Sequence, residues 1–471
     1  MIEAQSFTPR FSLVGLGKLG ATMAAAIAKR GFEVVGTDVN PRNVEAINAG
    51  RSPIMETGVA EAIAANRGRL RAVHSCEEAV LSSDLTFVVV PTPSDESGRF
   101  SLSYAADVFQ SIGRALAKTD KYHVVVLVST VLPGSMQFGL LPVIEEASGK
   151  KAGRDFGVCY SPEFIALGTV MRDFLNPDVF VIGESDERAG AYLARCYELL
   201  RENQAPCVRT GFHNAELIKI SINVYVTMKI TFANLLGAIC EQLPGADVDV
   251  VTRTVGMDQR IGGKYLTAGL GFGGPCFPRD NGAMIYTAKL LGEAMDLAET
   301  VTRVNRQWPE RLFAQIRPDL GPDTTVAVLG LAYKPATQVL EESQSIDLVR
   351  LALKAGVKRV VAYDPLAGDE ARAVFGNEIT VAGSARECVA GADVVIISTP
   401  DPAFRSLRAG DFRPSAVVFD CWRLLRDEFA SHLGITYKAY GLGGSPLQGS
   451  GRLRTAWALE AHTPAVASAH G

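Results

Sequence analysis

The sequence lacks the patterns that would tie the chain to a membrane or a nucleic acid. None of its apolar runs approaches the ~20 residues that cross a bilayer, and the residues before Phe11 have neither the basic nor the apolar region of a signal peptide. The net charge of -4 offers no basic field for a polyanion. We therefore expect a cytoplasmic protein with no membrane partner and no nucleic-acid partner.

Paired cysteines are also missing. The chain has eight cysteines, but they are widely spaced and form no CxxC pair. This argues against a zinc site and against a disulfide framework, so we expect no bound metal. Most of the eight are expected to be small buried apolar residues, and Cys276 is considered separately below.

What is present is a long, ordinary globular chain. Its 471 residues predict two to four domains, and 47% hydrophobic with 21% charged residues is typical of soluble proteins. Continuous apolar strands alternate with helical segments, which predicts parallel sheets covered on both faces. Strands are expected at 11–17, 33–38, 86–90 and 123–129, and in a second series at 325–330, 359–364, 393–398 and 416–420. Between the two series, apolar residues at helical spacing predict one long helix over 214–242.

A glycine-rich turn follows the first strand. Gly15, Gly17 and Gly20 fit the pattern G-x-G-x-x-G between a strand and a helix, and Asp38 ends the next strand. Such glycines allow a tight turn, a close approach to a pyrophosphate and close helix packing, while the acidic residue reaches a ribose hydroxyl. A carboxylate at that point repels a 2′-phosphate, so NAD is favoured over NADP. The alternative is a glycine turn with no ligand.

A second glycine-rich stretch contains a cysteine. Residues 271–280 read GFGGPCFPRD, and a helical pattern follows from about residue 281. A thiol near a helix N-terminus is acidified, Arg279 can add to this, and the thiolate is the reactive form. Asp280 could activate a water. The alternative is a buried cysteine in a structural loop.

These segments together resemble the UDP-glucose/GDP-mannose dehydrogenase family, most closely its UDP-glucose oxidisers. The resemblance covers nearly the whole chain. Besides the two glycine stretches it includes PTP at 91–93, STV at 129–131, SPEF at 161–164, NAELIK at 214–219 with Asn223, GMDQRI at 256–261 and GLAYKP at 330–335. The cysteine stretch is highly specific, and it lies in the family order.

The resemblance implies a fold of two doubly wound Rossmann-like α/β domains joined by a helical dimerisation domain with a long central helix. The implied boundaries are 1–210 for NAD, 211–318 for the helical domain, 319–452 for the sugar nucleotide and 453–471 for a flexible tail. It implies a homodimer or higher oligomer. It also implies oxidation of a sugar C6 alcohol to a carboxylate with two NAD per sugar, most consistent with UDP-glucose to UDP-glucuronate.

The implied chemistry runs through Cys276, which captures the intermediate aldehyde as a thiohemiacetal and then holds a thioester that water hydrolyses. A tetrahedral oxyanion is needed before an aldehyde carbon can release hydride. The implied catalytic residues are Cys276, Lys219, Asn223, Asp280, Glu163 and Thr130. Lys219 and Asn223 share one helix face at i, i+4. Without the family context, Lys219 would be read as a solvated lysine and Glu163 as a surface carboxylate.

The implied ligand contacts form two sets. Residues for the cofactor are Gly15, Leu16, Gly17, Lys18, Leu19, Gly20, Asp38, Pro91, Thr92, Pro93, Ser129, Thr130 and Arg279. Residues for the sugar nucleotide are Glu163, Phe164, Lys219, Asn223, Arg260, Lys264, Tyr265, Phe272, Gly273, Tyr333, Lys334 and Arg423. Arg260 is implied to reach the substrate across the dimer interface; its alternative reading is a surface ion pair.

Some positions depart from the family pattern. Leu167 replaces a glutamate, Glu341 replaces an arginine implied to touch the NAD phosphates, and Asp420-Cys421-Trp422 replaces Asp-Gly-Arg before Arg423. Losing a charged hydrogen bond weakens binding by about 1–3 kcal/mol. We expect the changes at Leu167 and Glu341 to compensate each other, so that Leu167→Glu alone weakens NAD binding.

Two other functions fit parts of the sequence. A two-electron dehydrogenase of the 6-phosphogluconate or 3-hydroxyacid type has a Rossmann domain and a catalytic lysine, but neither the cysteine stretch nor the second α/β domain. A non-catalytic sensor of nucleotide sugar or NAD would not need Cys276. Within the favoured class, dTDP-glucose, a UDP-N-acetylhexosamine and GDP-mannose remain alternatives to UDP-glucose.

Overall fold

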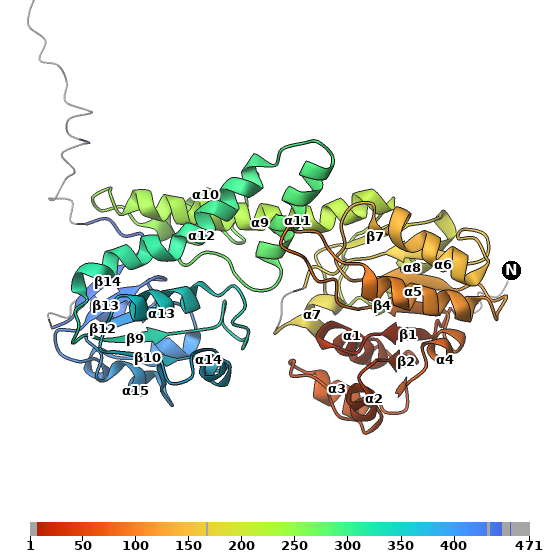
Figure 1. The fold of residues 1–471 in the computed structure, drawn as a ribbon, viewed down its shortest axis with the longest axis horizontal. Helices are drawn as coiled ribbons and strands as arrows, with labels where there is room; N and C mark the ends of the chain where they lie inside the picture. The colour runs from red at the N-terminus through yellow and green to blue at the C-terminus, as the bar shows by residue number, and fades with distance from the viewer. Residues whose placement is uncertain (1–6, 166–167, 431–433, 445–452, 454–471) are drawn as a thin grey trace, which may run out of the picture. The chain divides into compact units, whose positions relative to one another are not determined.

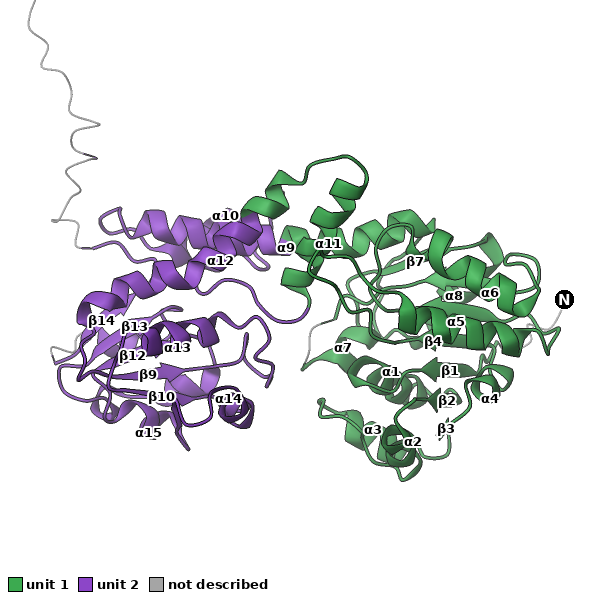
Figure 2. Cartoon of the chain, viewed as in Figure 1, with its two compact units in different colours: residues 1–225, 276–300 green, residues 226–275, 301–471 purple. Residues whose placement is uncertain are grey.

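The computed structural model describes residues 7–165, 168–430, 434–444 and 453, which divide into two compact units (Figure 2). Unit 1 comprises residues 1–225 and 276–300, and unit 2 comprises residues 226–275 and 301–471. Leu167 lies outside the described residues, as does the predicted tail apart from Leu453. The predicted boundaries of three domains remain a prediction.

Unit 1 contains an eight-stranded sheet in the order β3-β2-β1-β4-β5-β6-β7-β8, parallel except between β6 and β7 (Figure 1). The order reverses beside β1, and such a switch point is where open parallel sheets bind ligands. The strands are β1 (Phe11–Val14), β2 (Val34–Thr37), β3 (Leu70–Val73), β4 (Leu85–Val88), β5 (Val124–Leu127), β6 (Gly157–Tyr160), β7 (Phe180–Glu184) and β8 (Cys207–Thr210).

Helices cover both faces of this sheet. Along β5, Val124 and Val126 join one buried cluster, while Val125 and Leu127 join another on the opposite face. This is why the strands read as continuous apolar runs rather than as alternating patterns. The helices are α1 (Lys18–Lys29), α2 (Pro41–Asn48), α3 (Val59–Ala65), α4 (Cys76–Leu81), α5 (Ser103–Leu116), η1 (Ser135–Leu140), α6 (Leu141–Ser148), α7 (Val170–Leu175), α8 (Glu187–Leu200) and α11 (Phe277–Leu290).

Unit 2 contains a six-stranded parallel sheet in the order β11-β10-β9-β12-β13-β14, which repeats the layout of the first six strands of unit 1. Its strands are β9 (Thr325–Leu329), β10 (Arg359–Tyr363), β11 (Thr380–Val381), β12 (Val394–Ile397), β13 (Val417–Asp420) and β14 (Thr436–Ala439). Its helices are α10 (Val248–Met257), α13 (Gln344–Lys354), α14 (Gly368–Phe375), α15 (Ala385–Val389), α16 (Arg426–Phe429) and three 3₁₀ turns, η2 (Arg317–Asp319), η3 (Pro402–Ser406) and η4 (Ala409–Asp411). The predicted fold class is confirmed.

Two helices contribute to both units: α9 (Phe212–Cys240) and α12 (Asp296–Ile316). The long helix predicted over 214–242 is α9, and it is long and apolar enough to meet a length-and-composition criterion for a membrane span. However, it carries buried polar residues that bond to protein atoms. Lys219 donates to the Glu163 carbonyl, and Glu216 accepts from the N–H groups of Gly134 and Met136. These contacts identify α9 as a core helix.

Candidate active site

The turn after β1 has the shape that a pyrophosphate requires. Gly15 has φ +99°, and a Cβ there would lie 2.0 Å from the Val89 carbonyl oxygen. A Cβ on Gly20 would lie 1.9 Å from the Gly15 oxygen, so neither position accepts a side chain. Gly17 faces open space and begins α1 with no side-chain cap on the helix N–H groups. The turn is therefore an open cradle of backbone donors that fits the phosphates of a dinucleotide.

Asp38 holds this turn in place. One carboxylate oxygen accepts the Leu16 N–H at 2.6 Å, and the other accepts the Asn40 N–H at 2.7 Å. The side chain stays partly exposed, so it retains lone pairs for a ribose hydroxyl. Leu16 is fully buried in the core of unit 1, so any contact it makes with a cofactor is through its backbone. Lys18 is exposed at the start of α1.

The ends of β4 and β5 are joined across the same edge of the sheet. The Ser129 hydroxyl donates to the Val90 carbonyl at 2.6 Å and accepts the Val90 N–H at 3.0 Å. The Thr92 hydroxyl donates to the Thr130 carbonyl at 2.7 Å. The predicted cofactor residues at 91–93 and 129–130 thus form one edge with the glycine turn, because β1, β4 and β5 are neighbours.

A polar cluster, defined here as Cys276, Lys219, Asn223, Asp280 and Glu163, lies within unit 1. Its central contact is a 2.6 Å hydrogen bond from the Asn223 amide to the Asp280 Oδ2. Cys276 is the N-cap of α11, and its carbonyl accepts the Asp280 N–H at 2.9 Å. Lys219 donates from Nζ to the Glu163 carbonyl at 2.7 Å. The side chain of Cys276 is exposed, whereas Cys159 and Cys196 of unit 1 are buried.

Burial perturbs the charged groups of this cluster. Lys219 is 8% exposed, and burial lowers the pKa of its ammonium while the nearby Asp280 and Cys276 oppose that shift. Burial raises the pKa of Glu163 to about 8, with Lys219 acting against it. Glu163 Oε1 and Asp280 Oδ1 are buried with no hydrogen-bond partner among the described residues. Shifted pKa values and unsatisfied buried oxygens in one place are typical of an active site.

Two further residues of the predicted set in unit 1, Arg279 and Phe164, lie beside this cluster. Arg279 Nε is 3.5 Å from the Asp280 Oδ1, and its guanidinium lies 4.6 Å from the centre of the Phe100 ring. The Phe164 ring lies 5.1 Å from the Lys219 Nζ. Thr130 follows β5, and no hydrogen bond among the described residues ties its side chain to the cluster. Lys219 is buried, and so is the Glu163 Oε1. The alternative interpretations, in which Lys219 is a solvated lysine and Glu163 a surface carboxylate, are therefore wrong.

Part of the predicted sugar-nucleotide set of unit 2 gathers around the glycine frame, defined here as residues 271–274. Phe272 is 4% exposed. A Cβ on Gly273 would lie 3.2 Å from the Tyr333 side chain, and one on Gly274 would lie 2.6 Å from its ring. The Lys334 Nζ lies 5.7 Å from that ring. The backbone of Glu341, one of the departures, accepts the Gly274 N–H at 3.0 Å.

The predicted residues after α10 occupy an exposed turn. The Arg260 guanidinium forms an ion pair with Asp258 at 2.6 Å, with 87% of the arginine side chain exposed. Lys264 is exposed in the same turn, and Tyr265 is 50% exposed at φ +64°. Within one chain Arg260 thus has the geometry of a surface ion pair.

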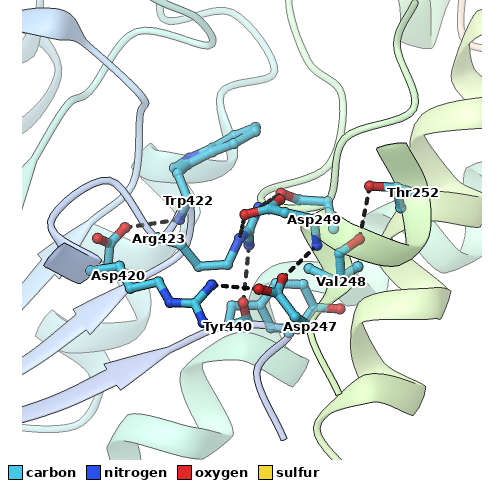
Figure 3. Close-up of polar contacts among 12 residues, drawn as sticks. Asp247, Val248, Asp249, Thr252, Asp420, Trp422, Arg423 and Tyr440 are labelled. Carbon is cyan, nitrogen blue, oxygen red and sulfur yellow. Dashed lines mark hydrogen bonds and ion pairs between the residues drawn. The ribbon is translucent and has the colours of Figure 1, made fainter. Parts of the chain in front are cut away.

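Arg423, which the sequence predicts to contact the substrate, binds protein groups in this structure (Figure 3). Its guanidinium binds Asp249 through two hydrogen bonds of 2.7 and 2.9 Å. The remaining N–H groups donate to the carbonyls of Ala268, Cys421 and Tyr440. A guanidinium has five N–H donors, and all are used within unit 2. Arg423 therefore joins the loop after β13 to α10 and to the segment before the glycine frame.

Asp364 is a functional candidate that sequence reasoning missed. It follows β10 as Asp38 follows β2, and its carboxylate accepts the N–H groups of Leu331, Ala332, Leu366 and Ala367 at 2.8–3.0 Å. It anchors the turn after β9, where Gly330 has φ +95° and where Tyr333 and Lys334 follow. Its position at the end of the second strand of a doubly wound unit was the available signal.

Known proteins are similar to this chain along nearly its whole length. The NAD binding domain, the central domain and the UDP binding domain of the UDP-glucose/GDP-mannose dehydrogenase family match residues 9–201, 213–307 and 327–427. The UDP-glucose 6-dehydrogenase AglM of Haloferax volcanii is 39% identical over 84% of this chain and 92% of that protein. The chain belongs to the UDP-glucose/GDP-mannose dehydrogenase family.

Members that act on different sugars are similarly related to it. The GDP-mannose 6-dehydrogenase of Azotobacter vinelandii is 37% identical over 84% of this chain and 93% of that protein. The structure of a UDP-glucose dehydrogenase from Pyrobaculum islandicum aligns with a TM-score of 0.84 and 36% identity, covering 94% of this chain and all of that one. The chain is thus a nucleotide-sugar dehydrogenase of this NAD-dependent family, and its glycine cradle lies in the NAD binding domain.

Proposed function

We propose that this protein oxidises the C6 alcohol of a nucleotide sugar to a carboxylate in two steps, with Cys276 as the covalent nucleophile. The observation that carries the proposal is the cluster in which α9 and α11 place Lys219, Asn223 and Asp280 beside the residue that caps α11. A simple alcohol dehydrogenase needs no nucleophile, whereas an aldehyde must become tetrahedral before its carbon can release hydride.

The cofactor for this reaction fits the glycine cradle. Gly15, Gly17 and Gly20 leave the backbone open to a pyrophosphate, and Asp38 is available to a ribose hydroxyl. Bound NAD supplies a hydride acceptor for each of the two oxidations. The carboxylate of Asp38 disfavours a 2′-phosphate at this place, which supports NAD over NADP.

The residues of the chain divide the remaining work. After the first hydride loss, the Cys276 Sγ bonds to the C6 aldehyde, and the Lys219 ammonium stabilises the oxyanion that develops on the former carbonyl oxygen. Loss of the second hydride leaves a thioester on Cys276. A water then adds to the thioester carbon and the thiolate leaves, with Glu163 or Asp280 receiving the proton of that water. Asn223 fixes the Asp280 carboxylate.

UDP-glucose is the substrate we favour, with UDP-glucuronate as the product. The support is the 39% identity to a UDP-glucose 6-dehydrogenase and the match to the family's UDP binding domain. GDP-mannose is the second candidate, because a GDP-mannose 6-dehydrogenase is 37% identical over the same share of the chain. dTDP-glucose and UDP-N-acetylhexosamines would use the same chemistry.

We further propose a homodimer in the cytosol. Exposed apolar side chains on α9, a helix that contributes to both units, are the surface we expect a second copy to cover: Leu217, Ile222, Tyr225, Phe232, Leu235 and Ile239. Arg260, exposed in an isolated chain, would then reach the substrate of the second copy. Light scattering of the purified protein tests the dimer, and a monomer at micromolar concentration would contradict it.

The test of the function is a product count. Purified protein is incubated with NAD and separately with UDP-glucose, GDP-mannose, dTDP-glucose and UDP-N-acetylhexosamines, and NADH formed per sugar consumed is measured. Two NADH from UDP-glucose supports the full proposal, and two NADH from another sugar moves the substrate only. One NADH per sugar contradicts the four-electron mechanism, and binding without turnover favours a sensor.

A further inference from the structure

The glycine frame has no helix or strand to hold its backbone. Residues 271–274 lie between the loop that follows α10 and the start of α11, and they lie outside both helices. Phe272, Gly273 and Gly274 are buried and Gly271 is partly buried, so the buried N–H and C=O groups need partners from elsewhere in the fold. In this protein side-chain amides from two helices provide partners for Gly271 and Phe272.

Asn305 on α12 hydrogen-bonds to both backbone groups of Phe272, as a residue of a neighbouring β-strand does. Its Nδ2 donates to the Phe272 carbonyl at 2.9 Å, and its Oδ1 accepts the Phe272 N–H at 2.9 Å. One side-chain amide thus pairs with both peptide groups of a single residue. Because Phe272 is almost fully buried, no solvent can replace these two bonds.

Gln344 at the start of α13 completes the arrangement. Its Oε1 accepts the Gly271 N–H at 2.6 Å, and its Nε2 donates to the Asn305 carbonyl at 2.7 Å. A Cβ at residue 271 would lie 2.1 Å from the Asn305 Oδ1 and 2.5 Å from the Gln344 Nε2. The fit leaves room only for glycine, so the two amides set the path of the backbone at this point. We call Asn305 and Gln344 the amide clamp.

The other end of the frame is held by the turn at residues 341–342, just before α13. A Cβ on Gly273 would lie 2.2 Å from the Glu342 carbonyl oxygen, and the Gly274 N–H donates to the Glu341 carbonyl. Glu342 itself has φ +52°, a strained conformation for a residue with a side chain. Strain that the surrounding contacts maintain marks a segment whose backbone shape matters.

We propose that Asn305 and Gln344 are positioning residues that hold the glycine frame in the conformation that binds the sugar nucleotide. The inference rests on the function proposed above, and it adds two residues that make no contact with the reacting atoms. Within the frame, Phe272 and Gly273 are the residues expected to contact the ligand, and Gly273 lies beside Tyr333. Without the clamp the frame would sample other conformations, and binding would have to select the competent one.

The test uses isosteric variants of the full-length protein. Asn305→Leu and Gln344→Met keep the side-chain volume and remove the hydrogen-bonding atoms. Each is expected to raise the KM for the sugar nucleotide and its Kd by about tenfold or more, which corresponds to ~1.4 kcal/mol per factor of ten. The KM for NAD and the yield of NADH per sugar are expected to stay unchanged. Gln315→Met on α12, whose amide binds Glu241 instead, is the matched control.

The outcomes separate this inference from the function it rests on. A wild-type protein that releases two NADH per sugar, with both clamp variants at wild-type KM, would overturn the inference alone. A wild-type protein with no turnover and no binding of UDP-glucose or GDP-mannose by calorimetry would overturn the proposed function and the inference with it. A fall in kcat and a rise in both KM values, together with a lower Tm, would indicate general unfolding, and this outcome too contradicts a positioning role. If Asn305→Leu does not fold, Gln344→Met and Asn305→Asp, which keeps shape and one acceptor, decide the result.

Discussion

The Asn223 amide on α9 donates to the Asp280 carboxylate on α11 at 2.6 Å, although the two residues are 57 positions apart in the sequence. Asp280 is fully buried, and its second oxygen has no hydrogen-bond partner among the described residues. An acid held by one amide, with a buried oxygen left over and an arginine 3.5 Å away, is oriented for a ligand or a water. The contact between Asn223 and Asp280 joins the face of α9 that carries Lys219 to the first turn of α11.

Removing the amide at residue 223 should disable Asp280. In Asn223→Ala the buried carboxylate loses its partner, which costs ~1–3 kcal/mol of stability. The kcat should fall by about tenfold to a hundredfold, since a misplaced acid or base loses its catalytic factor. Steady-state kinetics and urea unfolding measure the two effects. Asn214→Ala, on the same helix but bonded to Thr210, should change neither, and equal losses in both variants would contradict the assignment.

Cys276→Ser should abolish the two-step oxidation. A serine hydroxyl is a far weaker nucleophile at neutral pH, so kcat should fall by about 10³-fold or more. Mass spectrometry of the wild-type protein, quenched during turnover, should show a sugar thioester on Cys276. Cys207→Ser, a partly buried cysteine on β8, is the control and should retain activity. A Cys276→Ser protein that still releases two NADH per sugar would remove the covalent mechanism.

Glu163 should give the activity a rising limb near pH 8. Burial raises the pKa of this carboxyl to about 8, so the base form appears only as the pH rises through that value. Thioester hydrolysis should therefore accelerate between about pH 7 and 9. Glu163→Gln should lose the limb, while Glu198→Gln, at an exposed position of α8, should keep it. An unchanged pH–rate profile in Glu163→Gln would exclude this carboxyl as the base.

The same shift makes stability depend on pH. The folded state holds the Glu163 proton up to about pH 8, whereas the unfolded chain releases it near the ordinary glutamate value of about 4.3. The folded state binds more protons between those two values, so its stability falls as the pH rises through that window. Urea midpoints of wild type and Glu163→Gln should converge below about pH 4 and differ most near pH 8. A constant difference across the range would contradict the raised pKa.

Asp364→Asn should loosen the turn that carries Tyr333 and Lys334. The carboxylate accepts four backbone N–H groups, and an amide can retain only part of that set. We expect a loss of ~2–3 kcal/mol in unfolding free energy and a higher KM for the sugar nucleotide at unchanged KM for NAD. Asp369→Asn, exposed at the start of α14, should be neutral. A stable Asp364→Asn protein with wild-type affinity would show that the turn does not need its anchor.

Arg423→Lys should reduce stability more than substrate affinity. The guanidinium side chain is 2% exposed and its Asp249 partner is 42% exposed, so solvent screens part of the pair. The loss should nonetheless be ~2–3 kcal/mol, because buried carbonyls also lose donors. Thermal unfolding and sugar-nucleotide KM distinguish the two roles, with exposed Arg405→Lys as control. A raised KM at wild-type Tm would restore the substrate contact predicted from the sequence.

The architecture and the reaction class follow from patterns in the sequence alone. The apolar strands, the glycine turn with Asp38 and the helical pattern at 214–242 depend on local spacing, and the cysteine stretch is specific enough to indicate a family. Strand ends were placed a residue or two too long, as at 86–90 against Leu85–Val88, because residues beyond the last ladder bond remain apolar.

Which distant residues contact each other depends on the packing of the folded chain. Three hydrogen-bonded pairs join residues that lie far apart in the sequence: Asn223 with Asp280, Asp249 with Arg423, and Phe272 with Asn305. No periodicity in the sequence reveals that the hydrogen-bonding groups of these pairs face each other. Arg423 matched a family pattern by proximity in sequence, yet its burial and five satisfied donors give it a structural role. Burial and partner geometry depend on how distant elements pack, and therefore Glu163 acquires its raised pKa and the glycine frame its amide clamp only in the folded chain.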